Sequence, residues 1–196
     1  MLPIDHLVWG APNLEWEIER FEDLTGVRAP IGGRHPDEGT HNALIRLGPA
    51  AYLELISPDP TLPPPPHPRW FGLDTLTQPR LVTWAAKATE LDGRGEVRTG
   101  RRELNDGRIL SWRLTYPRLH PGDGLVPFLI DWGTSPHPAD SAPGGVQLVE
   151  LRAEHPDPDA VRRPIRALGF ELGVALGPAP ALIATLSTPR GTIELR

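Results

Sequence analysis

The chain has 196 residues, enough for one domain or two closely packed subdomains, and its 39% apolar residues can supply a core. Its 25 prolines and 20 glycines favour short elements joined by rigid turns. Cysteine is absent, which excludes disulfides, thiolate metal ligands and a cysteine nucleophile. The formal charge of −5, without a block of lysine or arginine, argues against nucleic acid as a partner.

Membrane and secretion signals are also missing from the sequence. No run approaches the roughly 18 apolar residues that a membrane span needs. The first residues, M-L-P-I-D-H, lack the basic and apolar regions of a signal peptide. We therefore expect a cytoplasmic protein whose partner is a small-molecule ligand, with no membrane partner; a homodimer stays open.

The first predicted unit spans residues 1–57 and has the order βαβββ. A buried strand is expected over residues 4–9. Asn13 can cap a helix, and Leu14, Ile18 and Phe21 follow at i, i+4 and i+7, which places them on one apolar face. Gly26 is a typical helix stop. Three further strands are expected over residues 27–31, 40–47 and 51–56.

Residues 58–79 read as a linker. They include the run P-T-L-P-P-P-P-H-P, whose composition favours polyproline II. A stiff, extended spacer is expected there rather than a packed segment.

The middle stretch, residues 80–135, is less regular and is interpreted as a degenerate module. A strand is expected over residues 81–85, a short helical segment over 87–91, and further strands over 108–115 and 127–132. Asn105-Asp106-Gly107 favours a hairpin turn, because Asp-Gly tolerates the positive φ that such turns need.

Residues 145–196 repeat the order of the first unit. A strand over 146–152 is followed by Asp157-Pro158, a helix cap with proline at the first helical position. Val161, Ile165 and Leu168 give the apolar face, and Gly169 the stop. Strands are expected over 170–172, 181–186 and 192–195. The shared order predicts an internal repeat in which His6 lies opposite Glu150.

Four motifs together resemble a known family: D-H-L-V-W-G, then G-G-R-H-P with G-T-H-N-A-L, then Y-L-E-L-I, and P-F-L-I-D-W followed by H-P. They are similar to the glyoxalase-like domain family of the vicinal oxygen chelate superfamily. The resemblance implies an α+β fold in which repeated βαβββ modules form one curved mixed sheet with helices outside it, as one compact domain.

The resemblance also implies a metal site, because active members of the superfamily take ligands from the first and last strands of each module. In this sequence those positions are His6 and Glu54. The middle unit offers no histidine on its first strand; its last strand offers Asp131, or Ile130 at an offset of one. In the C-terminal unit the matching positions are Glu150 and Glu194. The implied cofactor is one divalent ion: Zn, Ni, Mn or Fe.

Other residues are assigned from strand alternation and chemistry. Glu54 is costly to bury without a partner, which favours a metal ligand or a general base. His41 and Asn42 lie on opposite faces of one strand, so only one can face the cup. The strand tryptophans pack in the core or line the site; they are Trp9, Trp112 and Trp132. The remaining histidines sit beside proline in apparent loops, where exposure or a turn-shaping role is expected: His35, His67, His120, His137 and His155.

Two functions remain open from the sequence. One is a metal-assisted enzyme of isomerase, lyase or dioxygenase type, in which the ion polarises vicinal oxygens. The other is a metal-free protein that binds or sequesters a small ligand. Both require His6 and Glu54 to lie on adjacent strands and to face the same side.

Overall fold

The structure is a computed structural model that describes residues 4–104, 107–116 and 123–196. Its elements, in chain order, are β1 (Ile4–Gly10), α1 (Leu14–Thr25), β2 (Ile31–His35), β3 (Thr40–Arg46), β4 (Tyr52–Pro58), the 3-10 helix η1 (Trp70–Thr75), β5 (Arg80–Lys87), β6 (Val97–Leu104), β7 (Ile109–Thr115), β8 (Phe128–Asp131), the 3-10 turn η2 (Pro138–Asp140), β9 (Gln147–His155), α2 (Pro158–Ala167), β10 (Gly173–Leu176), β11 (Ala181–Thr188) and β12 (Gly191–Leu195).

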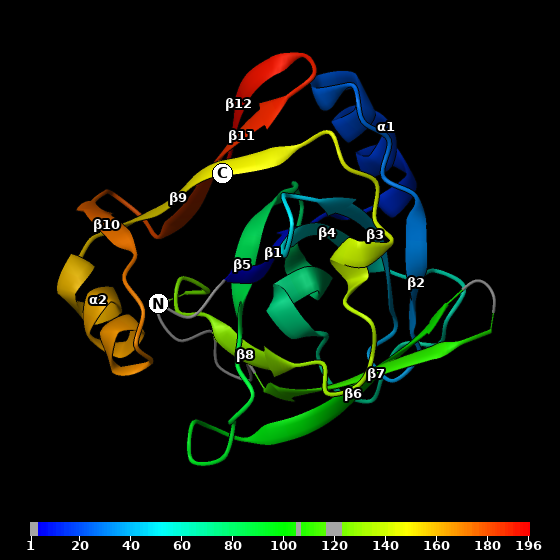
Figure 1. Ribbon diagram of the computed structural model, residues 1–196, viewed down its shortest axis with the longest axis horizontal. Coiled ribbons are helices and arrows are strands. Elements are labelled where there is room, and N and C mark those ends of the chain that lie inside the picture. Colours follow the sequence, from blue (N-terminus) through cyan, green and yellow to red (C-terminus); the bar gives the residue numbers. More distant parts are fainter. Residues whose placement is uncertain (1–3, 105–106, 117–122) are drawn as a thin grey trace.

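The first eight strands close into a barrel (Figure 1) made of two halves with the same wiring. The first half has the order β1-β4-β3-β2 and the second β5-β8-β7-β6. In each half the first strand pairs in parallel with the last. Antiparallel pairs, β1 with β5 and β2 with β6, join the halves at both seams. The middle stretch of the sequence is therefore the true partner of the first module.

The helix of the first half forms as the sequence predicts. Asn13 accepts a hydrogen bond from the backbone N–H of Trp16, and Gly26 ends α1 with a φ of 79°. Leu14, Ile18 and Phe21 are buried on its inner face. α1 packs on the outside of β3 and β4, so the interior of the barrel remains free for other groups.

The second half lacks a helix between its first two strands. The predicted helical segment at residues 87–91 is wrong: β5 continues to Lys87, and irregular backbone follows. The strand β6 was not predicted, because V-R-T-G-R-R-E-L shows no apolar alternation and buries only Arg102. Asn105 and Asp106 of the predicted hairpin turn lie outside the described residues; Gly107 has a φ of 81° and leads into β7.

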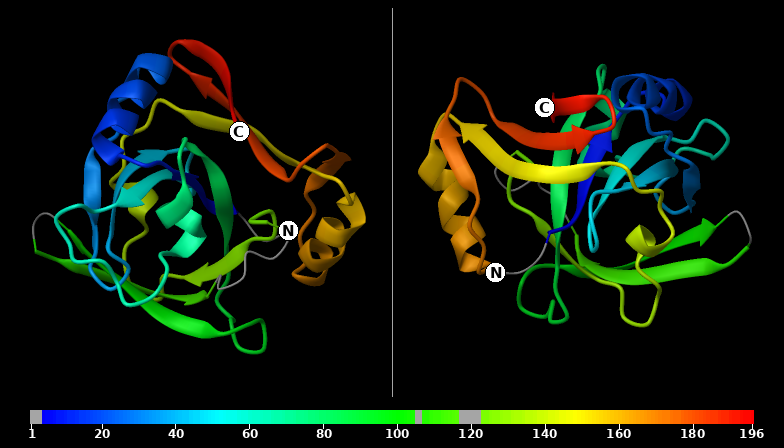
Figure 2. Two further views of the ribbon diagram at one scale, coloured as in Figure 1. Left: turned by 180° about the vertical axis from the view of Figure 1, so that it is seen from behind. Right: turned by 45° about the horizontal axis from the view of Figure 1, so that its top comes forward.

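The C-terminal unit forms a separate sheet of order β10-β9-β11-β12 and lies beside the barrel (Figure 2). Its element order matches the prediction, and Asp157 caps α2. The predicted repeat is nevertheless wrong in its pairing. β9 lies between β10 and β11, whereas β1 pairs with its module's last strand. The order of elements along the chain does not determine which strands pair. In this unit β11 also packs against an apolar outer face of the barrel.

That cover replaces the helix missing from the second half. Phe170 meets Trp84 of β5 edge to face, with ring centroids 5.7 Å apart. Buried residues of β11, Leu182, Ala184 and Leu186, belong to the same apolar core as the outer face of β1 and β5. A second core fills the barrel itself. Among the described residues, no helix combines the length and the apolar character that crossing a bilayer requires.

The proline-rich linker is not extended throughout, which corrects the expectation from its composition. Residues 70–75 form η1, which appears in the middle of the barrel in Figure 1. Phe71 and Leu73 are buried, and Phe71 stacks on Phe128 of β8 with centroids 5.8 Å apart. Phe71 also has a φ of 59°, a left-handed conformation that costs an aromatic residue about 1–3 kcal/mol.

Candidate functional site

The interior of the barrel contains a small cavity of about 30 Å³, enough for one or two water molecules. Its walls come from both halves and from η1. The lining residues are His6, His35, Asn42, Tyr52, Glu54, Trp70, Phe71, Arg102, Trp112, Leu114, Phe128, Ile130 and Trp132. Five residues predicted from the sequence for the site are thus brought together: His6, Asn42, Glu54, Trp112 and Trp132. Of the alternative pair His41 and Asn42, Asn42 is the one that faces the cavity.

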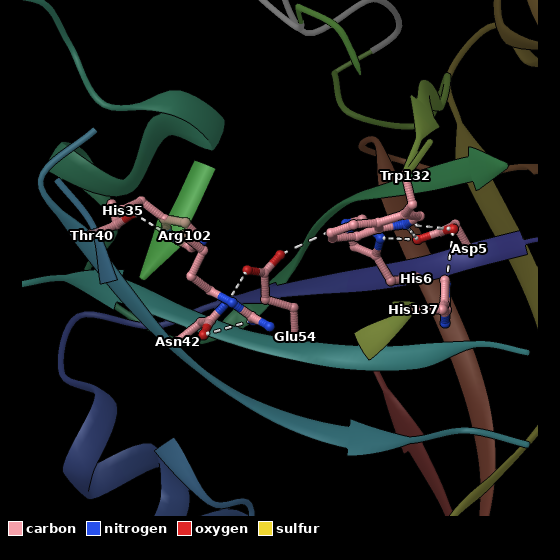
Figure 3. A network of polar contacts seen from close by, with 9 residues as sticks. All are labelled: Asp5, His6, His35, Thr40, Asn42, Glu54, Arg102, Trp132 and His137. Carbon is pink, nitrogen blue, oxygen red and sulfur yellow. Dashed lines mark hydrogen bonds and ion pairs between the residues drawn. The ribbon is translucent and has the colours of Figure 1, made fainter. Parts of the chain in front are cut away.

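His6 and Glu54 meet across two neighbouring parallel strands. His6 of β1 is in register with Tyr52 of β4, and Glu54 lies two residues further along the same face. His6 Nε2 is 3.7 Å from Glu54 Oε2, and both side chains are buried (Figure 3). The structure therefore confirms that these residues lie on adjacent strands and face the same side.

Asp5 binds the imidazole of His6 at Nδ1, the nitrogen that does not face Glu54. Its Oδ1 lies 2.8 Å from His6 Nδ1, and its Oδ2 lies 3.1 Å from His137 Nε2. Trp132 Nε1 donates to the same carboxylate, at 3.1 Å from Oδ2. Burial alone would raise the pKa of Asp5, but the hydrogen bonds from His137 and His6 outweigh it and hold that pKa well below its usual range. Asp5 is therefore an anion at neutral pH.

These contacts fix the proton positions on both imidazoles. His137 Nδ1 accepts from the backbone N–H of Ala139, so Nε2 carries the proton that His137 donates to Asp5. An anionic Asp5 can only accept, so His6 Nδ1 must be its donor. His6 Nε2 is therefore the nitrogen that faces Glu54 and is left to exchange a proton.

On the other side, Glu54 is held by an amide and, beyond it, a guanidinium. Asn42 Nδ2 donates to Glu54 Oε1 at 2.6 Å. Arg102 Nη1 donates to Asn42 Oδ1 at 3.3 Å. Asn42 therefore stands between a buried anion and a buried cation (Figure 3).

Aromatic rings enclose these polar groups. His6 stacks on Tyr52 with centroids 4.6 Å apart, and Phe128 meets His6 edge to face at 5.5 Å. The rings of Trp112 and Trp132 contact each other, with centroids 5.1 Å apart. Burial, with Asp5 adding to it, raises the pKa of Tyr52 well above its usual value, so this ring stays neutral.

His35 is a site residue that the sequence did not indicate, because its neighbouring Pro36 favoured an exposed loop. It ends β2, is buried, and its Nδ1 lies 2.9 Å from Thr40 Oγ1. Burial and the neighbouring Arg102 lower the pKa of His35 to about 3. His35 is therefore a neutral wall of the cavity.

η1 separates the cavity from a much larger open groove. That groove has a volume of about 670 Å³ and is bordered by η1 residues together with Asp123 and Pro180. Phe71 borders both spaces. The side chain of Phe71 thus stands between bulk solvent and the polar groups of the barrel.

The other predicted site residues lie elsewhere. Trp9 belongs to the outer core and donates to Glu17 Oε1. His41 points away from Asn42 and lines an outer groove. Asp131 accepts from the backbone of Gly133, while Ile130 faces the cavity. In the C-terminal sheet, Glu150 is exposed and Glu194 pairs with Arg152. Trp9, His41 and Asp131 lie outside the site because neighbouring side chains of a strand point to opposite faces. Glu150 and Glu194 lie outside it because they belong to the separate C-terminal sheet.

The donor set does not complete a site for a resident divalent metal. His6 Nε2 and Glu54 Oε2 approach each other at the cavity, but the described residues contain no group of three His, Asp or Glu able to hold an ion. Structural and catalytic zinc sites use three or four protein ligands. The inward residues of β8, Phe128 and Ile130, offer none.

Paired modules with this wiring, curved around an interior site, form a glyoxalase-like fold of the vicinal oxygen chelate superfamily. The family model described as a glyoxalase-like domain matches residues 4–169. The chain belongs to this family, as its motifs predicted. No curated protein matches the sequence.

Solved structures of similar fold include methylmalonyl-CoA epimerases. One from Mycobacterium tuberculosis is 20% identical, with a TM-score of 0.45 over 66% of this chain and 87% of that one. One in complex with methylmalonyl-CoA and NH4+ is 20% identical, with a TM-score of 0.47 over 70% of this chain and 99% of that one. A variant from Streptomyces coelicolor in complex with 2-nitronate-propionyl-CoA is 20% identical, with a TM-score of 0.46 over 66% and 97%. The likeness concerns the fold alone.

Proposed function

We propose that this protein is a small-molecule enzyme of the isomerase or lyase type in which Glu54 and His6 transfer protons without a resident metal. The observation that carries this proposal is the approach of His6 Nε2 to within 3.7 Å of Glu54 Oε2 inside the barrel. Each group is also held by a buried partner, Asp5 behind His6 and Asn42 behind Glu54. A second group that orients a base is a recurring feature of acid–base sites.

The chemistry needs a substrate with an acidic C–H next to a carbonyl. The Glu54 carboxylate takes the proton from that carbon, and the electron pair moves to the carbonyl oxygen to give an enolate. When His6 carries a second proton, on Nε2, it can donate that proton to the developing oxygen or to the carbon on the other face. Glu54, which has gained a proton from the substrate, then passes one back to His6 Nε2, so both groups return to their starting state. The gap of 3.7 Å exceeds a hydrogen bond, so a substrate atom can come within reach of both groups. Asp5 acts here as a positioning residue.

Substrate entry requires a change at η1. A cavity of about 30 Å³ does not hold a substrate of several non-hydrogen atoms. Trp70 and Phe71 are the lining residues that belong to neither half of the barrel. Moving them would join the cavity to the open groove beyond Phe71, and the left-handed φ of Phe71 favours such a release.

The second candidate is binding without turnover, and the aromatic lining favours it. Tyr52, Phe128, Trp112 and Trp132 offer a large contact area with little loss of conformational entropy. A binding protein would use the same cavity, so only a test for chemistry separates the two functions.

The test is proton exchange in D₂O, followed by NMR, on a panel of small 2-oxo acids and dicarbonyl compounds. We expect protein-dependent exchange at the carbon next to the carbonyl, with a loss of about 10²–10⁴-fold in Glu54→Gln. Glu150→Gln is the matched control, because Glu150 is exposed on the other sheet. Chelator treatment should leave the exchange unchanged.

Three results would overturn parts of this proposal. Exchange that survives in Glu54→Gln would remove Glu54 as the base. Exchange that is lost with chelator and restored by a divalent ion would restore the metal-assisted reaction. Compounds that quench tryptophan fluorescence but never exchange a proton would support the binding protein.

A further inference from the structure

Arg102 is a buried cation that forms no ion pair with the described residues. It is 4% exposed, and its Nε is buried with no hydrogen-bond partner among the residues that the structure describes. Within that part of the chain its guanidinium makes one hydrogen bond, to the neutral amide of Asn42. No carboxylate of the described residues lies within 4 Å of it, and it lines the barrel cavity.

Such an arrangement is costly to the folded state. A guanidinium keeps its charge inside a protein, so Arg102 cannot escape the cost of burial by losing a proton. A buried charge is normally paired, because leaving it unpaired is strongly destabilising. Methionine or leucine would fill the same space at lower cost, so the charge itself calls for an explanation.

The chain also makes room for this side chain. A Cβ at Gly32 would lie 3.2 Å from Arg102 Nη1 and 2.6 Å from Asn42 Oδ1. A Cβ at Gly33 would lie 2.8 Å from Arg102 Cγ and 2.3 Å from the backbone oxygen of Glu103. The Gly-Gly pair of β2 therefore allows the stem of Arg102 to pass from β6 into the barrel.

A second unsatisfied donor lines the same cavity. Trp70 Nε1 of η1 is buried and finds no hydrogen-bond partner in residues 4–104, 107–116 and 123–196. Two donors without acceptors, one of them charged, are complementary to a ligand that carries negative oxygen atoms.

We propose that Arg102 anchors a carboxylate group of the ligand, so that the substrate class is small carboxylic acids. A planar carboxylate matches the guanidinium fork and is smaller than a phosphate. The cavity of about 30 Å³ admits such an anion once Trp70 and Phe71 of η1 move aside. Asn42 links Arg102 to Glu54, so a carboxylate held by Arg102 places the adjoining carbon toward the proton-transfer pair. That orientation rests on the proposed function, whereas the binding of the anion does not.

The test uses the full chain and needs no turnover. Acetate is titrated while tryptophan fluorescence and Tm are followed, with acetamide as the neutral isostere and phosphate as the second anion. We expect acetate to raise Tm and to bind at least tenfold more tightly than acetamide or phosphate. Arg102→Met should weaken acetate binding at least tenfold, and Arg102→Lys should restore part of it.

Arg101→Met is the matched control, because Arg101 is the neighbour on β6, is exposed, and pairs with Asp37 at the surface. It should bind acetate as the parent does. The Tm of Arg102→Met without ligand should equal or exceed that of the parent, since the variant removes an unpaired buried charge.

Four results would overturn the inference: equal binding of acetate and acetamide, phosphate binding as tight as that of acetate, unchanged binding in Arg102→Met, or a marked fall in its Tm, which would show a structural role. If acetate binds through Arg102 but no proton exchange is found, the proposed reaction fails and the anion site stands.

Discussion

The two halves of the barrel share one wiring and differ in chemistry. In the first half, Asp5 and His6 of β1, Asn42 of β3 and Glu54 of β4 form a connected polar network. In the second half, the residues of β7 and β8 that face the cavity are apolar or aromatic: Trp112, Leu114, Phe128 and Ile130, with Trp132 directly after β8. Among the described lining residues, Arg102 is the one charged group of that half.

The difference shows that a repeated scaffold does not require a repeated ligand set. The strand pairing depends on backbone hydrogen bonds and on outward apolar residues, which both halves keep. The inward positions are free to diverge. One half then supplies the proton-transfer groups, while the other supplies walls and a single cation. Trp132 joins the two, because its indole N–H donates to Asp5 across the cavity.

The largest expected effect comes from the centre of the polar half. Asp5→Asn should lower the free energy of unfolding by about 3 kcal/mol at pH 7, because the amide leaves at least one of three buried donors without an acceptor. Urea unfolding followed by circular dichroism measures this loss. Asp37→Asn, which removes a surface ion pair, should stay close to the parent. A parental stability for Asp5→Asn would mean that the network does not hold the site together.

A smaller effect should appear in the pH dependence of stability. The pKa of His35 is about 3 in the folded state and about 6.5 in the unfolded chain. The unfolded state therefore binds the proton first as the pH falls below about 6.5. Between about pH 6.5 and pH 3, protonation of His35 in the unfolded chain should lower the free energy of unfolding by about 1.4 kcal/mol for each pH unit by which the pH falls.

Urea unfolding between pH 7.5 and 5 measures that slope. His35→Gln should flatten it by about one proton, whereas His67→Gln should not, because His67 is exposed. Equal slopes in the parent and in His35→Gln would show that His35 takes up its proton in the folded protein as well.

Much of the fold could be predicted from the sequence, because the apolar periodicity of α1 records which face of the helix is buried. In addition, β1 and β4 are short apolar runs that are buried along nearly their whole length. The strand β6 escaped, since its inward residue is Arg102, and a charged residue at a buried position breaks the apolar pattern. The strand pairing of the C-terminal unit was mispredicted for another reason. Its order of elements is that of a βαβββ module, but which strands pair depends on contacts between residues distant in sequence.

The sequence indicated site residues that lie on strands or directly after one: His6, Asn42, Glu54, Trp112 and Trp132. His6 and Glu54 are polar residues in two short apolar strands of one module, at the positions where the family resemblance implies ligands. Asp5 and His137 are 132 residues apart, and η1 comes from a linker that composition assigned to solvent. Phe71 and Trp70 reach the cavity through tertiary packing, which local sequence does not encode.

The central claim is that His6 keeps its proton on Nδ1 and exchanges one at Nε2 opposite Glu54. ¹⁵N NMR of histidine-labelled protein reports the state of each ring nitrogen directly. The expected result is a protonated Nδ1 for His6 at neutral pH, with an Nε2 resonance that shifts in Glu54→Gln but not in Glu150→Gln. A His6 that carries its proton only on Nε2, or an Nε2 resonance indifferent to Glu54→Gln, would contradict the account.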